Sequence, residues 1–218
     1  MKPSVTDYLI AVELVDRLVD MGVLDYLWRG DSHPRMEDWF ISLGGHSFFV
    51  EDLGFQCFHG ASKLCFFNED ELSDWVIKVD YRDNSHHYSL IESENYRRAQ
   101  ENGLETYFAA TYPLCERDGV SFFIQERVEC DENEVSFKWF SLMKEHFYPE
   151  DFDTEEEMNW TVADAVEELS DIERVDLLFG NQNLIDFLID NRINDLHQGN
   201  FGFLEDRIVI MDYCGWYR

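Results

Sequence analysis

The stretch Asp195-Leu196-His197-Gln198-Gly199-Asn200, followed by Asp212-Tyr213-Cys214-Gly215, is the most informative part of the sequence. An aspartate and an asparagine five residues later share one predicted loop, and a hydrophobic run over residues 207–211 then ends at a second aspartate. Asp195 can orient or deprotonate a hydroxyl group. The side-chain oxygens of Asn200 and Asp212 can hold Mg²⁺ against phosphate oxygens, and Mg²⁺ prefers such hard ligands.

This pattern resembles the protein-kinase-like superfamily. The loop DLHQGN is most similar to the D-x-H-x-G-N loop of small-molecule and aminoglycoside kinases, and DYCG stands where protein kinases have D-F-G. The resemblance implies that Asp195 is the catalytic base, that Asn200 and Asp212 bind metal, and that ATP and Mg²⁺ are the cofactors. The alternative interpretation is an acidic turn in which Asp and Asn only cap the backbone.

A kinase-like fold also needs a lysine on its third strand to pair with phosphates, and a glutamate on the next helix to position that lysine. Lys78 is the only positive charge in the apolar stretch WVIKV, residues 75–79. The following helix, predicted over residues 89–102, carries Glu92 and Glu94. These two cannot both face inward, since residues two apart on a helix do not share a face. We expect Glu94 to pair with Lys78, with Glu92 as the alternative.

A phosphate-binding loop should precede that lysine. The stretch over residues 55–63 lies before Lys78 and between two predicted strands, where the family has its glycine-rich loop. It departs from the G-x-G-x-x-G pattern of that loop, because Gly54 and Gly60 are six residues apart and no third glycine accompanies them. The candidate phosphate contacts are backbone groups of Gly60, Ala61 and Ser62, and Lys63 adds positive charge. The alternative is an ordinary hairpin.

The strand predicted over residues 119–128 corresponds to the segment that leads into the hinge between the two lobes of the family. Gln125 stands at the gatekeeper position, and the residues from Glu126 to Val128 offer backbone groups to adenine. A helix predicted over residues 183–191 leads directly into the catalytic loop. The resemblance therefore extends over most of the chain.

Hydrophobic spacing predicts the remaining elements. Residues 4–28 read as one amphipathic helix that begins with a capping box of Ser4 and Asp7, and residues 29–45 read as irregular. Further strands are predicted over residues 47–50, 53–58, 62–67, 74–80 and 106–115, with a hairpin over 202–213.

We therefore predict an α+β, kinase-like bilobal fold with an antiparallel sheet N-lobe and a reduced helical C-lobe. The predicted domains are an N-terminal helical extension over 1–46, a sheet-rich nucleotide lobe over 47–128 and a reduced helical catalytic lobe over 129–218. Only three residues follow Gly215, so we expect the substrate-binding part to be minimal or to come from a partner.

The chain has 218 residues, with 46 acids against 17 bases and a net charge of −29. Such a surface repels phosphate backbones and anionic lipids, which disfavours nucleic-acid and membrane binding and favours a basic protein or a cationic small molecule. Nucleotide binding is still compatible with this charge, because salt at ~0.15 M screens exposed charges beyond ~8 Å. Residues 150–157, EDFDTEEE, read as a solvated segment or as a docking patch for a basic partner.

Five cysteines without a C-x-x-C pair indicate reduced thiols and a cytoplasmic protein. The predicted function is ATP- and Mg²⁺-dependent phosphoryl transfer to a cationic or small-molecule substrate. One alternative is a non-catalytic pseudokinase or acidic decoy that binds a basic partner. Another is transfer of a different nucleotide moiety, such as AMP, by the same site.

Overall fold

The computed structural model describes residues 2–27, 40–44, 47–50, 54–59, 62–82, 87–130, 181–193, 200–205 and 207–214. The chain divides into two compact units. The first consists of Met1–Glu94 and Ala110–Arg127, and the second of Asn95–Ala109 and Val128–Arg218. The mixture of helices with antiparallel strands confirms the predicted α+β class.

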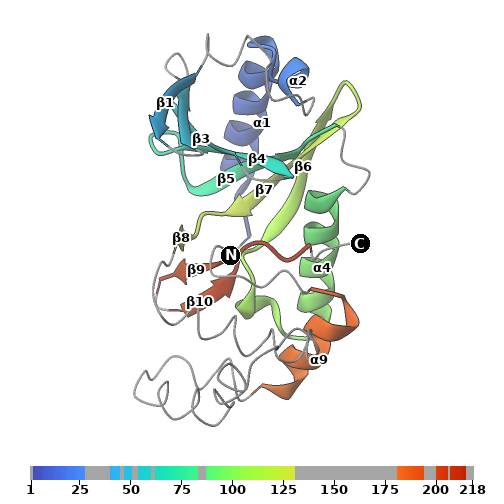
Figure 1. Cartoon of the computed structure of the whole chain (residues 1–218). Coiled ribbons are helices and arrows are strands. Elements are labelled where there is room, and N and C mark those ends of the chain that lie inside the picture. The colour runs from blue at the N-terminus through green and yellow to red at the C-terminus, as the bar shows by residue number, and fades with distance from the viewer. Residues whose placement is uncertain are drawn as a thin grey trace, which may run out of the picture. The chain divides into compact units, whose positions relative to one another are not determined.

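A seven-stranded antiparallel sheet forms the centre of the first unit (Figure 1). Its strands lie in the order β1-β2-β3-β4-β5-β7-β6, so every neighbouring pair but β5–β7 is also consecutive in the chain. The strands are β1 (Phe40–Gly44), β2 (Ser47–Val50), β3 (Phe55–His59), β4 (Lys63–Asn68), β5 (Leu72–Asp80), β6 (Thr111–Arg117) and β7 (Val120–Glu126).

Strand β1 corrects the prediction that residues 29–45 are irregular. It pairs antiparallel with β2, with Phe40 opposite Val50 and Ile41 opposite Phe49. The segment is short and ends beside two glycines, so it shows too little alternation to be recognised as a strand. Its conformation follows from backbone pairing with its neighbour rather than from local pattern.

Helix α1 (Val5–Asp20) covers one face of this sheet (Figure 1). The predicted capping box is present: the Asp7 N–H donates to Ser4 Oγ at 3.1 Å, and the Ser4 N–H donates to Asp7 Oδ2 at 2.7 Å. The single helix predicted over 4–28 is in fact broken. Gly22 adopts a left-handed conformation with φ 91° and separates α1 from the short helix α2 (Val23–Tyr26).

The core of the first unit decides which side chains of β5 face α1. Trp75, Ile77 and Val79 are buried in the same cluster as Leu14 and Leu18 of α1. Because successive side chains of a strand point to opposite faces, the residues between them point to the other face of the sheet. Lys78 is one of these residues.

The second unit contains the C-terminal part of α4 (Tyr88–Glu101), the 3₁₀ helix η2 (Glu105–Tyr107) and α9 (Gln182–Asp190). Its described strands form a three-stranded antiparallel sheet in the order β10-β9-β8, with β8 Glu129–Cys130, β9 Phe201–Leu204 and β10 Arg207–Ile210. An aromatic cluster lies beside it: the ring of Phe108 is 5.7 Å from Phe187 and 5.0 Å from Tyr213. None of the described helices is both long and apolar enough to cross a membrane.

Candidate functional site

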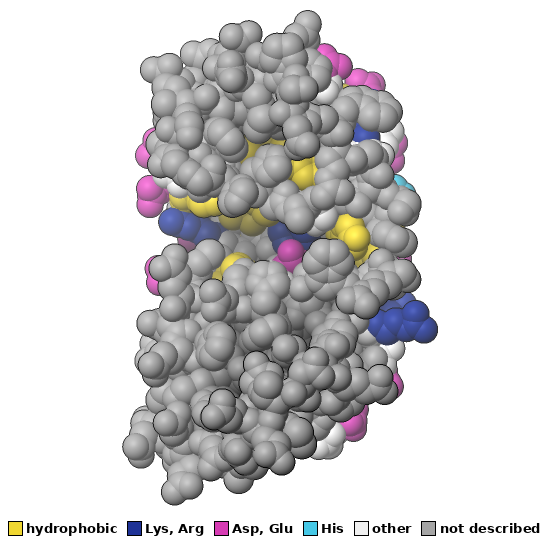
Figure 2. All heavy atoms as spheres, viewed as in Figure 1, with side chains coloured by type: hydrophobic (Ala, Val, Ile, Leu, Met, Phe, Trp, Pro, Cys, Tyr) yellow, Lys and Arg dark blue, Asp and Glu magenta, His cyan; other side chains and the backbone are white. Residues whose placement is uncertain are grey.

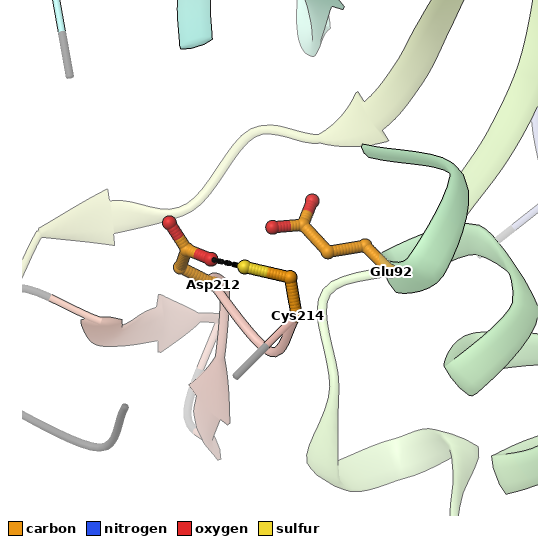
Figure 3. A group of neighbouring side chains, drawn as sticks. All are labelled: Glu92, Asp212 and Cys214. Atoms are coloured by element: carbon orange, nitrogen blue, oxygen red, sulfur yellow. Dashed lines mark hydrogen bonds between the residues drawn. The ribbon is translucent and has the colours of Figure 1, made fainter. Parts of the chain in front are cut away.

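Lys78 forms a buried ion pair within the first unit. Its Nζ lies 2.8 Å from Oε2 of Glu92, and only 4% of Lys78 is exposed to solvent. Glu92 extends from α4 and is completely buried (Figure 3). A strand lysine and a helix glutamate are therefore joined as the sequence pattern predicts, although with a different glutamate.

The prediction that Glu94 pairs with Lys78 is wrong. Glu94 is exposed, and the ion pair goes to Glu92, the alternative. Helical geometry explains the difference. Ser89, Glu92, Tyr96 and Ala99 are buried at intervals of three and four residues, which defines the inward stripe of α4, and Glu94 lies outside it.

Lys63 contacts the same carboxylate. The Lys63 ammonium group donates to Glu92 Oε1, while Lys78 donates to Oε2. Both lysines are 4% exposed. We call the three side chains Lys63, Glu92 and Lys78 the two-lysine cluster. Its formal charge is positive, because it holds two ammonium groups and one carboxylate.

Asp80 holds the beginning of α4 against the end of β5. Its carboxylate accepts hydrogen bonds from the Ser89 N–H at 3.0 Å and from the Ser89 hydroxyl at 2.6 Å. Ser89 is one helical turn before Glu92 and on the same stripe. The bond therefore orients the helix so that Glu92 faces the two lysines.

The proposed phosphate loop is only partly described. Gly60 and Ala61 lie outside the described residues, while Ser62 is half-buried and its carbonyl accepts the Tyr81 N–H at 3.1 Å. Phosphate contact by these three residues stays a prediction.

The residues predicted to form the hinge have internal hydrogen bonds that the sequence did not indicate. The Glu126 N–H donates to the Ala110 carbonyl, and the Glu126 carboxylate accepts the Ala110 N–H, both at 2.9 Å. Gln125 is buried and donates to the Thr111 hydroxyl at 2.7 Å. The Glu126 N–H and carboxylate thus brace the strand. Binding of adenine by Glu126 and Val128 stays a prediction.

In the second unit, Asn200 and Asp212 are brought to the same end of the β9–β10 hairpin. Ile210 pairs with Phe201, and the Met211 N–H donates to the Asn200 carbonyl at 2.9 Å beyond that pair. Asn200 is buried, and the Asp212 carboxylate accepts a hydrogen bond from the Cys214 thiol at 3.1 Å (Figure 3). An amide oxygen and a carboxylate suit Mg²⁺, so these residues fit the predicted metal.

Tyr213 anchors the backbone next to Asp212. The buried Tyr213 hydroxyl donates to the Ala109 carbonyl at 2.7 Å, and the Tyr213 carbonyl accepts a hydrogen bond from Asn95 Nδ2 at 2.9 Å. Neither contact is apparent from the sequence. Asn95 and Tyr213 are 118 residues apart in the chain, so local pattern carries no signal of their bond.

Asp195 lies outside the described residues, as do the other residues from 194 to 199 and the acidic segment 150–157. The role of Asp195 as catalytic base therefore stays a prediction. The prediction that Asp212 shares a cleft with Lys78 concerns residues of different units, and it stays a prediction as well.

The chain is similar to a solved structure, the Legionella pneumophila Lpg2603 kinase bound to IP6. The TM-score is 0.32 and the sequence identity 10%, and the match covers 83% of this chain and 64% of that chain. This chain therefore spans less than two thirds of the length of that kinase. No family model matches the chain, and no curated protein matches it significantly.

Proposed function

We propose that the protein is an ATP- and Mg²⁺-dependent phosphotransferase with a kinase-like bilobal fold, which acts on a cationic or small-molecule acceptor. The observation that carries the proposal is the buried ion pair between Lys78 on the interior strand β5 and Glu92 on helix α4. Burying a lysine is costly unless it is paired or serves a ligand. The pairing places the ammonium group at a defined point, which is what recognition of a phosphate requires.

In this function Lys78 binds phosphate, Glu92 positions Lys78, and Asn200 with Asp212 holds Mg²⁺. The metal supplies positive charge to the phosphate oxygens. Asp195 orients the acceptor hydroxyl and receives its proton while the hydroxyl oxygen bonds to the γ-phosphorus and the bond from that phosphorus to the ADP oxygen breaks.

The first test is nucleotide binding. Calorimetry should detect ATP binding that requires Mg²⁺ in the parent protein, and both Lys78→Met and Asp212→Ala should weaken it strongly. Ionic strength should be held constant with NaCl, because Mg²⁺ alone stabilises so acidic a protein by screening. ATP binding that is the same in all three proteins would exclude this site.

The second test is turnover. Asp195→Asn should keep Mg²⁺-dependent ATP binding and lower ATP consumption by ~10²–10⁴-fold, which is the usual contribution of a positioned general base. Mass spectrometry of the modified acceptor then distinguishes a transferred phosphate from a transferred AMP. Unchanged turnover in Asp195→Asn would remove this residue from the catalytic role.

A non-catalytic role in binding a basic partner is the second candidate, and the charge distribution favours it. The net charge is −29, and the basic side chains of Lys63 and Lys78 are buried. Figure 2 shows carboxylate side chains at several places on the described surface. If this candidate is correct, Asp195→Asn changes partner affinity little. Neutralising the acidic segment then weakens binding, most at low salt; its residues are Glu150, Asp151, Asp153, Glu155, Glu156 and Glu157.

We also propose a cytoplasmic location. Cys57, Cys65, Cys115 and Cys214 are the cysteines whose side chains the structure describes, and they form no disulfide bond, as expected in a reducing compartment. Burial raises the pKa of the Cys57 thiol, which keeps it protonated and unreactive.

A further inference from the structure

We propose that the first unit holds a second ligand site, a pocket that takes a small molecule with an apolar body and a protonated amine. The pocket has a volume of about 430 Å³, within the ~300–1,000 Å³ typical of small-molecule sites. Its lining comes from the end of β5 and the two residues after it, the beginning of α4, the β6–β7 turn and the first part of β7. The described residues that line it are not those predicted to bind phosphate, adenine or metal, so the inference does not depend on the proposed function.

Helix α4 contributes to both this pocket and the two-lysine cluster, but with different faces. Glu92 contacts the lysines, whereas Leu90 lines the pocket. Residues two apart on a helix do not share a face, so the pocket and the cluster meet different sides of α4. Phe123 of β7 lines the pocket and is directly opposite Lys78 of β5, so the pocket reaches the face of the sheet from which Lys78 extends. The pocket is therefore a neighbour of the cluster and not a part of it.

The apolar part of the lining indicates the body of the ligand. Phe123 and Val120 are buried, whereas Leu90 is 41% exposed although it is large and apolar. A ligand that covers the Leu90 side chain removes its apolar surface from water, which favours binding. Apolar walls of this kind are typical of small-molecule sites, in which a few polar groups fix the orientation of the ligand. An aromatic or aliphatic body of modest size therefore fits this pocket.

The charged part of the lining indicates the sign of the ligand. Two carboxylates, those of Asp80 and Asp118, line the pocket together with one guanidinium, that of Arg82. With His87 counted as neutral, two negative charges and one positive charge give the lining a formal charge of −1. Arg82 already has an interaction partner within the structure, and the Asp80 carboxylate accepts hydrogen bonds from Ser89. Asp118 is exposed at the β6–β7 turn, where its carboxylate can meet a cation from solvent. Since the net charge of −29 also raises the local concentration of cations, an ammonium group suits the pocket better than a carboxylate.

Occupation of the pocket should hold the beginning of α4 in place. Asp80 lines the pocket, and its carboxylate accepts hydrogen bonds from the Ser89 N–H and hydroxyl at 3.0 and 2.6 Å. Leu90, the next residue of α4, lines the pocket as well. A bound ligand therefore contacts both the strand end and the helix that these hydrogen bonds join. Because a ligand stabilises the arrangement that it binds, local opening of this junction should become rarer.

Three indole derivatives of similar size test the chemical class of the ligand. Tryptamine carries an ammonium group, tryptophol an uncharged hydroxyl and indole-3-propionate a carboxylate. Calorimetry at constant ionic strength and neutral pH should show that tryptamine binds about three- to tenfold more tightly than tryptophol, a gain between that of an exposed ion pair and that of a buried charged hydrogen bond. Indole-3-propionate should bind most weakly. Failure of tryptamine to bind, or equal affinities for tryptamine and tryptophol, would overturn the proposal.

Two variants with matched controls locate the site. Asp118→Asn should weaken tryptamine binding by about three- to tenfold and leave tryptophol binding unchanged. Asparagine tolerates the left-handed conformation that Asp118 adopts at φ 50°, so the turn should keep its shape. The control Glu116→Gln removes a nearby exposed carboxylate that does not line the pocket, and it should change neither affinity. Leu90→Ala should weaken the binding of tryptamine and tryptophol alike, by about three- to tenfold, whereas Leu9→Ala at an exposed leucine of α1 should weaken neither.

Hydrogen exchange gives a readout that does not depend on the folding of any variant. In the parent protein, tryptamine should slow amide exchange at the beginning of α4 and in the β6–β7 turn. Slower exchange confined to other segments would place the ligand elsewhere and overturn the proposal. Equal losses of tryptamine affinity in Asp118→Asn and Glu116→Gln would also overturn it, since they would show attraction by the overall negative charge rather than by this pocket.

Discussion

At the residue scale, Glu92 is completely buried and contacts two lysine ammonium groups, whereas Glu94 on the same helix is exposed. Glu92→Gln should lower the free energy of unfolding by about 3–5 kcal/mol, because it leaves buried charge without its counter-charge. The matched control Glu94→Gln should change it by less than about 0.5 kcal/mol. Urea unfolding measures both, and equal losses would contradict this account of the two-lysine cluster.

Sequence pattern singled out Lys78 and two candidate partners, but it favoured Glu94 over Glu92, for a physical reason. A glutamate two positions away has the same chemistry, so only the rotation of α4 distinguishes Glu92 from Glu94. Tyr96 and Ala99 could have indicated that rotation, since both share the inward stripe with Glu92. The contact of Lys63 with Glu92 had no such signal, because it depends on the β4–β5 register.

At the element scale, the pairing of β8 with β9 depends on the missing side chain of Gly202. A Cβ there would lie 2.4 Å from the Glu129 carbonyl oxygen, which is backbone of the neighbouring strand. Gly202→Ala should lower the free energy of unfolding by about 1–3 kcal/mol, the usual cost of overpacking. Because β9 begins directly after Asn200, Mg²⁺-dependent ATP binding should weaken too.

Thermal unfolding and calorimetry measure these two effects of Gly202→Ala. Gly119→Asn is the control, because a Cβ at Gly119 would meet nothing within 4 Å, and asparagine tolerates the left-handed conformation that Gly119 adopts at φ 75°. A Gly202→Ala variant as stable as this control would show that β8 does not depend on that close approach.

Another element-scale prediction concerns the attachment of α1 to β6. Asp16 of α1 accepts a hydrogen bond from Arg117 Nε at 2.6 Å, and this bond lowers the pKa of Asp16 below its usual 3.8. A lowered pKa in the folded state stabilises the protein above the unfolded-state pKa, and the stabilisation is lost as the pH falls through the folded-state pKa. The parent should thus exceed Asp16→Asn in stability at pH 6 and lose that advantage on acidification.

The free energies of unfolding of the parent and of Asp16→Asn, measured at several acidic pH values, should become equal as the pH falls. A difference in stability that stays constant with pH would show that the Asp16 carboxylate is not the group responsible. The contact is largely exposed, so salt should reduce its contribution as well.

Elements of the first unit were predictable where the pattern of hydrophobic residues and the turn-forming residues indicated the same element boundaries. The strands β2 to β5, strand β7 and the body of α4 lie close to their predicted positions, whereas β6 begins at Thr111 rather than at residue 106, and residues 105–107 form the 3₁₀ helix η2. Strand β1 and the break at Gly22 were not predicted. The conformation of β1 depends on backbone pairing with the adjacent strand β2, and the break at Gly22 depends on a left-handed backbone conformation that a helical hydrophobic pattern does not reveal.

At the scale of the whole molecule, 46 acids against 17 bases should cause net repulsion within the folded protein. The melting temperature should therefore rise as NaCl increases from about 20 mM to about 0.5 M, because salt screens the repulsion. Scanning fluorimetry measures the trend, with a neutral osmolyte as the control for effects unrelated to charge. A falling melting temperature would mean that favourable ion pairs such as Arg17–Glu71 outweigh the repulsion.

Helix α4 has a practical consequence for anyone who wishes to divide this protein. Its 14 residues are assigned half to the first unit and half to the second, with the change between Glu94 and Asn95. A fragment cut there would carry only part of a helix, well below the ~12–15 residues at which an isolated helix becomes even marginally stable. Separately expressed halves should therefore be insoluble or unfolded alone and recover structure only when refolded together.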